Sequence, residues 1–70
     1  MSDLDRQLLR AHEEQDAFGL VDLYTRAADE VGEGTAAKFF LTQAYVFALE
    51  SGHPRTSELR VRLRALKSEE

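Results

Sequence analysis

The 70-residue chain contains no cysteine, no tryptophan and only one proline. The absence of cysteine excludes a disulfide framework and any metal site built on thiolates. The longest uninterrupted apolar run, Ala44–Leu49, is far shorter than the roughly 20 residues that span a bilayer. The start of the chain, MSDLDRQL, is acidic and polar, unlike a secretory signal. We therefore expect a cytoplasmic protein that does not cross a membrane.

Catalytic and cofactor-binding patterns are missing as well. Two histidines and no cysteine provide no Ser/His/Asp or Cys/His set. His12 and Asp16 have the i, i+4 spacing of a helical zinc motif, but a third protein ligand is not found. Residues 32–37 match a glycine-rich dinucleotide motif that functions only after a strand, and no strand is predicted there. We predict no enzyme activity, no metal and no cofactor.

Helical spacing of apolar residues runs through the whole chain, and no segment alternates as a strand does. The segment Gly32-Glu33-Gly34 is a helix stop, and Thr35 is the expected N-cap of the next helix. Gly52-His53-Pro54 ends that helix, with Pro54 in the first position of a further one. Short loops imply antiparallel neighbours. These features predict one all-α domain over residues 1–70, with helices at residues 3–14, 17–31, 35–51 and 54–67.

Two architectures remain open at the junction between the first two helices. No proline forces a break between residues 15 and 19, and Gly19 weakens a helix interior by only about 1 kcal/mol. We favour a break there, which gives two antiparallel helical hairpins in a repeat-like four-helix array. The alternative is a three-helix bundle in which the first two helices fuse into one from Asp3 to Val31.

The third predicted helix, TAAKFFLTQAYVFALES, carries apolar side chains on nearly every side. Such a helix must be covered on several sides, so it is the expected centre of the core. Substituting Phe40 or Phe47 by Ala is expected to cost roughly 3–5 kcal/mol. The predicted core consists of Leu8, Ala11, Leu20, Leu23, Tyr24, Ala27, Phe40, Leu41, Ala44, Phe47, Ala48, Leu59 and Leu63.

A degenerate internal repeat links the two predicted hairpins. The segment Leu8–His12 corresponds to Leu41–Tyr45 at an offset of 33 residues (41 − 8). A period near 34 is typical of helix–turn–helix repeats, and the stretch LLRAHEEQDAFGLVDLYTRAAD resembles a unit of the tetratricopeptide repeat family. The resemblance implies stacked helical hairpins that bind other proteins through a groove, without indicating a ligand class. The residues that carry it are Leu8, Ala11, Leu20, Tyr24, Ala27, Leu41, Ala44 and Tyr45.

Three apolar residues of the third helix exceed what four short helices are expected to bury. Phe39, Val46 and Leu49 lie on other sides than the main apolar face, and Tyr45 is expected at the rim of the surface they form. We therefore predict a small interaction or adaptor module that associates with itself as a homodimer or binds another protein.

Charge is unevenly distributed and suggests how copies associate. Residues 1–35 carry three arginines and nine carboxylates, for a net charge of −6, whereas residues 36–70 carry a net charge of +2. Arg60, Arg64 and Lys67 form a basic stripe, which we expect to dock onto an acidic face of a second copy. That acidic face consists of Asp22, Asp29 and Glu30.

The basic last helix also supports an alternative function, that of a nucleic-acid-associated regulator. No aromatic side chain lies between residues 55 and 70 to stack on bases, and the rest of the surface is acidic. A protein partner is therefore favoured over nucleic acid.

Overall fold

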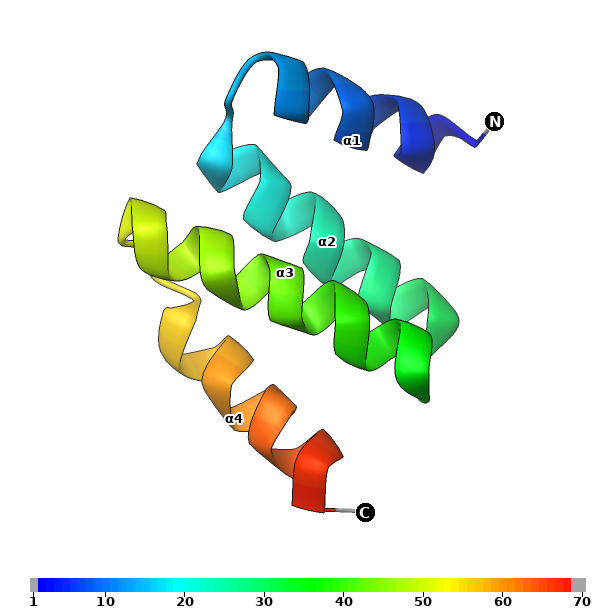
Figure 1. Ribbon diagram of the computed structural model, residues 1–70, viewed down its shortest axis with the longest axis vertical. Helices are drawn as coiled ribbons and strands as arrows, with labels where there is room; N and C mark the ends of the chain where they lie inside the picture. Colours follow the sequence, from blue (N-terminus) through cyan, green and yellow to red (C-terminus); the bar gives the residue numbers. More distant parts are fainter. Residues whose placement is uncertain (1, 69–70) are drawn as a thin grey trace.

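The computed structural model describes residues 2–68, and the side chains of residues 2–66. It contains the helices α1 (Asp3–Glu13), α2 (Ala17–Val31), α3 (Thr35–Ser51) and α4 (Thr56–Ser68), and no strand within the described residues. The predicted all-α fold of two helical hairpins is confirmed (Figure 1).

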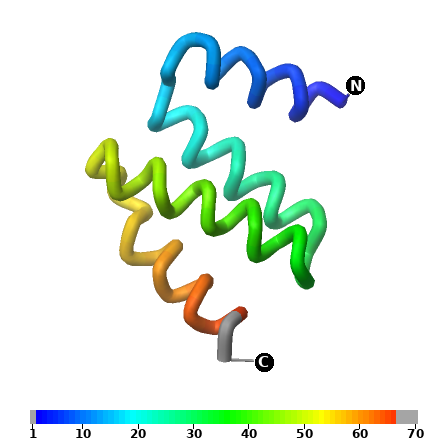
Figure 2. Tube along the Cα trace, viewed as in Figure 1, coloured from blue at the N-terminus to red at the C-terminus, as the bar shows by residue number. Residues whose placement is uncertain are grey.

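The four helices lie side by side in chain order, with α1 and α4 at opposite edges of the array (Figures 1 and 2). The principal extents are 35 × 28 × 12 Å, so the helices form a flat layer. The closest packing is between α2 and α3, whereas α1 packs on α2, and α4 packs on α3. A single layer leaves both of its broad faces without a second layer to cover them.

The junction of α1 and α2 is broken by two local signals. Gln15 adopts a left-handed φ of 56°, and the amide of Asp16 donates to the carbonyl oxygen of Ala11 at 2.9 Å, which closes α1. The carboxylate of Asp16 then accepts the amide of Gly19 at 3.0 Å and caps the start of α2. The fused three-helix alternative is therefore wrong, because the Asp16 cap starts a new helix where neither proline nor glycine stands.

The cap makes a specific prediction for Gly19. A Cβ at this position would overlap the Asp16 carboxylate and displace the cap. Gly19→Ala therefore gains about 1 kcal/mol in helix propensity and loses a similar amount of stability with the cap. We expect almost no net change in the urea-unfolding free energy. In an Asp16→Ala background the same substitution should stabilise by about 1 kcal/mol. An equal effect in both backgrounds would contradict the cap.

In the second hairpin, the cap of α3 and the start of α4 differ from prediction. Gly34, with φ 93°, is the N-cap of α3, and no side chain caps this helix, so Thr35 is its first residue rather than its cap. Helix α4 begins at Thr56 instead of residue 54, and Pro54 lies in the preceding turn. The predicted left-handed Gly52 is confirmed, with φ 66°.

His53 explains why the α3–α4 turn is longer than predicted. Its buried imidazole accepts the amide of Arg55 through Nδ1 at 3.0 Å, and its carbonyl oxygen accepts the hydroxyl of Thr56 at 2.7 Å. The ring also packs on Phe18 of α2, with centroids 4.7 Å apart. These bonds hold residues 53–55 in a turn, so the helix starts after them.

The core is built largely from small side chains. Alanines at the α2–α3 contact allow the two helices to approach closely, and Leu59 of α4 inserts fully buried against them. The predicted core was incomplete. Val21, Ala28 and Ala37 were not predicted to belong to it, although each is at most 1% exposed. The central cluster comprises Val21, Ala28, Leu41, Ala44, Ala48 and Leu59.

Several larger residues predicted for the core are only partly buried. Tyr24, Phe40, Phe47 and Leu63 pack against the cluster from outside it. Because the array has one layer, no helix of the described residues lies over the outer side of these rings. The cost of Phe40→Ala or Phe47→Ala should therefore fall below the predicted range of about 3–5 kcal/mol. The other predicted residues in this class are Leu8 and Leu23.

Ion pairs connect α4 to α2, and helical spacing puts the α2 carboxylates on the opposite side of that helix from Tyr24. Arg62 donates to Asp29 at 2.7 Å, and Arg55 lies 3.7 Å from Asp22. The carboxylates are about 60% exposed, so each pair stabilises the fold by at most about 1 kcal/mol. Glu30 lies 3.8 Å from Arg26, so all three acidic residues expected to receive a second copy are already paired within the chain.

Candidate interaction surface

Helix α3 carries an exposed apolar stripe opposite its buried side. Phe39, Val46 and Leu49 are 55%, 41% and 56% exposed. With Thr42 they recur at alternating intervals of three and four residues, the spacing of the a and d positions of a heptad. We call Phe39, Thr42, Val46 and Leu49 the α3 stripe. The same helix turns Ala37, Leu41, Ala44 and Ala48 into the core.

A row of aromatic rings borders the stripe on the side of α2. Phe39 meets Phe40 edge-on with centroids 5.6 Å apart, and Phe40 lies 6.2 Å from Tyr24. Tyr24 stacks on Phe47 at 6.1 Å, and Phe47 reaches the ring of His12 at 5.8 Å. The row connects α3 to α1 over α2 and extends the apolar surface beyond the stripe.

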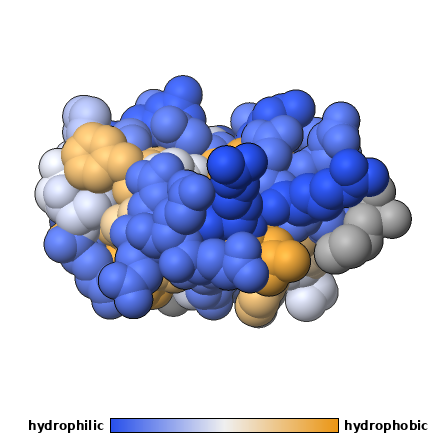
Figure 3. Space-filling model, turned by 90° about the horizontal axis from the view of Figure 1, so that it is seen from above, coloured by the Kyte–Doolittle hydropathy of each residue, from blue (hydrophilic) through white to orange (hydrophobic). Residues whose placement is uncertain are grey.

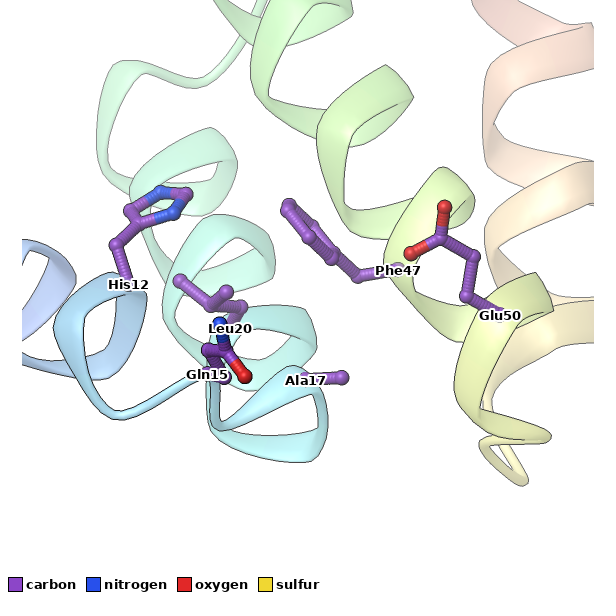
Figure 4. A pocket seen from close by; sticks show the side chains of 6 residues that line it. All are labelled: His12, Gln15, Ala17, Leu20, Phe47 and Glu50. Carbon is purple, nitrogen blue, oxygen red and sulfur yellow. The ribbon is translucent and has the colours of Figure 1, made fainter.

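An open pocket of about 300 Å³ lies at the far end of this row (Figure 4). In Figure 4, His12 of α1 and Phe47 of α3 stand on its two sides, with Glu50 beyond Phe47. Leu20, Ala17 and Phe47 supply apolar surface, and the polar lining consists of His12, Gln15 and Glu50. Its volume is at the lower limit for small-molecule sites, and it continues into the aromatic row.

Two polar side chains at or beside this pocket have structural partners. His12 Nε2 and the Tyr24 hydroxyl are hydrogen-bonded at 2.8 Å, while Asp16 caps α2. The two residues with zinc-motif spacing therefore serve different local contacts. Among the side chains that the structure describes, no three His, Cys, Asp or Glu residues gather as metal ligands.

Burial of Tyr24 gives a pH-dependent prediction. Desolvation raises the pKa of its phenol above the ordinary value, because burial disfavours the phenolate. The folded state therefore holds the proton more tightly than the unfolded chain, and stability should fall as the pH rises above about 10. Tyr24→Phe should reduce that loss in urea unfolding at pH 9–11. An alkaline loss in this variant equal to that of the unaltered protein would contradict the assignment.

The other flank of the stripe faces α4. Tyr45 is half-buried and packs against the core cluster together with Leu63 and Leu66. Arg60 and Arg64 are exposed; helical spacing places Arg60 on the α3 side of α4, next to Leu63, and turns Arg64 further outward. The side chain of Lys67 lies outside the described residues.

Tyr45 thus adjoins the α3 stripe on the same helix, and helical spacing puts Arg60 on the flank of α4 nearer the stripe and Arg64 further from it. The aromatic row was missed at the sequence level because Tyr24, Phe40 and Phe47 were all assigned to the core. The seven-residue interval from Phe40 to Phe47 parallels that from Phe39 to Val46. This doubled repeat was the signal that a second apolar face was present.

The surface on the α1 side is less hydrophobic than the surface formed by the α3 stripe and the aromatic row. Seen from the α1 side, the molecule is mostly hydrophilic, and hydrophobic side chains show only in separate small groups (Figure 3).

Within residues 2–68, no helix combines the length and the apolar character needed to cross a bilayer. No family model matches the chain, and neither a curated protein nor a solved structure matches it.

Proposed function

We propose that this chain is a small protein-interaction module without catalytic activity, and that it associates with itself through the α3 stripe. The observation that carries the proposal is the heptad-spaced exposure of Phe39, Val46 and Leu49 on a helix whose opposite side is fully buried. Scattered apolar residues are normal on surfaces, whereas a row of them that continues into exposed aromatic rings indicates an interface. A helix of α3's length presents such a row to a partner helix.

Two further expectations belong to the same proposal. The pair of helical hairpins and the Leu8/Leu41 repeat support a distant relation to the tetratricopeptide family, whose members bind proteins. A cytoplasmic location agrees with the absence of cysteine. The nucleic-acid alternative is weakened, because Arg55 and Arg62 of the basic segment contact carboxylates of α2.

Dilution followed by nuclear magnetic resonance tests the proposal. Between millimolar and micromolar concentrations, the amide resonances of residues around Phe39, Val46 and Leu49 should shift, because their environment changes as copies separate. Amides around Leu9 on the outer side of α1, which is 53% exposed, serve as the internal control. Concentration-independent spectra, or shifts confined to α1, would refute self-association through α3.

A further inference from the structure

The distribution of charge across the array restricts how two copies can pair. Residues 2–16, at the α1 edge, carry five carboxylates and two arginines, for a net charge of −3. Residues 55–68, at the α4 edge, carry five basic residues and one carboxylate, for a net charge of +4. Opposite edges of one flat molecule therefore have opposite charge (Figure 1).

A symmetric dimer of such a layer has three simple two-fold arrangements. An axis perpendicular to the layer places like edges against each other, and an in-plane axis across the helices places α1 over α1 and α4 over α4. Both bring like charges together. An axis parallel to α3 instead places the basic α4 of each copy over the half of the other copy that contains α2 and the acidic α1. Only this third arrangement combines burial of the α3 stripe with complementary charge.

The flanks of the stripe fit the same arrangement at the level of single residues. Glu50 follows Val46 on the flank that faces the α1–α2 pocket, and Tyr45 precedes Val46 on the flank that faces α4. In parallel helix pairs, each flank of one helix meets the opposite flank of the other. Helix α4 begins beside the C-terminal end of α3 (Figure 1), and helical spacing puts Arg60, in the second turn of α4, on the flank nearer the α3 stripe.

We propose that two copies pack face to face with their α3 helices parallel and in register, so that Glu50 of each lies against Tyr45 and Arg60 of the other. This inference rests on the proposed self-association and adds its geometry. Glu50 is exposed, and none of the described side chains forms an ion pair with it, so it is available to a cation from a second copy.

Charge reversal tests the contact between Glu50 and Arg60. Glu50→Arg or Arg60→Glu alone should weaken the dimer about tenfold or more, and the double variant should recover to within about threefold of the original affinity. Arg64→Glu, which changes the net charge by the same amount on the outward side of α4, is the matched control and should have a much smaller effect. A double variant no tighter than the singles, or a control equal to Arg60→Glu, would overturn the contact.

Cross-linking tests the parallel register independently. The chain has no cysteine, so Thr35→Cys and Thr42→Cys each introduce a single thiol at d positions of the heptad, about 10 Å apart along α3. In a parallel pair both variants should form disulfide-linked dimers on mild oxidation, since each thiol faces its own equivalent. An antiparallel pair would link one of them at most, and that result would overturn the arrangement while leaving self-association intact. A protein that is monomeric throughout would instead remove the proposed function itself.

Discussion

Replacing Leu59 by Ala is expected to lower the free energy of unfolding by about 2–5 kcal/mol, the usual cost of truncating a buried leucine. Leu59 has no exposed surface and is the one α4 side chain in the central cluster of the described residues. A chain of this size has a total stability of roughly 3–10 kcal/mol. The loss is therefore a large share of the whole, and α4 should detach first, because its other contacts with α2 are exposed ion pairs.

Urea unfolding followed by circular dichroism measures this effect, with Leu9→Ala as the matched control. Leu9 is the same residue type on the outer side of α1, where it is 53% exposed, so its truncation should change stability by less than about 0.5 kcal/mol. If both variants unfolded at the same urea concentration, burial of Leu59 would not be what stabilises the packing of α4.

Introducing a charge into the α3 stripe should separate the two copies without unfolding either one. Val46→Glu places a carboxylate at the centre of the proposed interface, where truncating or charging a central residue costs at least about 2 kcal/mol of association, or roughly 30-fold in affinity. The fold of each copy should persist, because Val46 is 41% exposed and lies outside the core cluster.

Val61→Glu provides a closely matched control for this variant. Val61 is also a helical valine, it is 64% exposed on the outward side of α4, and the substitution changes the net charge equally. Light scattering with size-exclusion chromatography compares the two proteins at the same concentration and salt. A dimer that survives Val46→Glu, or that dissociates equally with Val61→Glu, would show that the α3 stripe is not the contact.

The positions of the helices were largely predictable because most helix ends are determined by residues at or next to the end itself. The bounds of α2 and α3 agree with prediction, since Gly32 and Gly52 adopt the positive φ angles that stop a helix. The start of α4 was not predictable in the same way. It depends on the imidazole of His53, which binds the Arg55 amide only once the turn is formed and packed against Phe18.

Burial was harder to predict than helix position, because periodicity identifies an apolar face without showing what lies opposite it. Phe40 and Phe47 have the spacing of core residues, yet the single-layer arrangement leaves their outer sides uncovered. Ala28 and Ala37 have little side-chain surface and were passed over, yet they permit the close approach of α2 and α3. The exposure of Phe39, Val46 and Leu49 was expected from the sequence because they face away from the buried side of their own helix.

Sedimentation equilibrium of the unaltered protein, over micromolar to millimolar concentrations at low and high salt, tests most directly whether the uncovered side of α3 is a contact between copies. A single chain has a mass of 7.9 kDa. The apparent mass should rise toward twice that value with concentration, and the rise should need more protein at high salt, because opposite charges face each other across the pair. A mass that stays at 7.9 kDa up to the highest concentration at either salt would contradict the account.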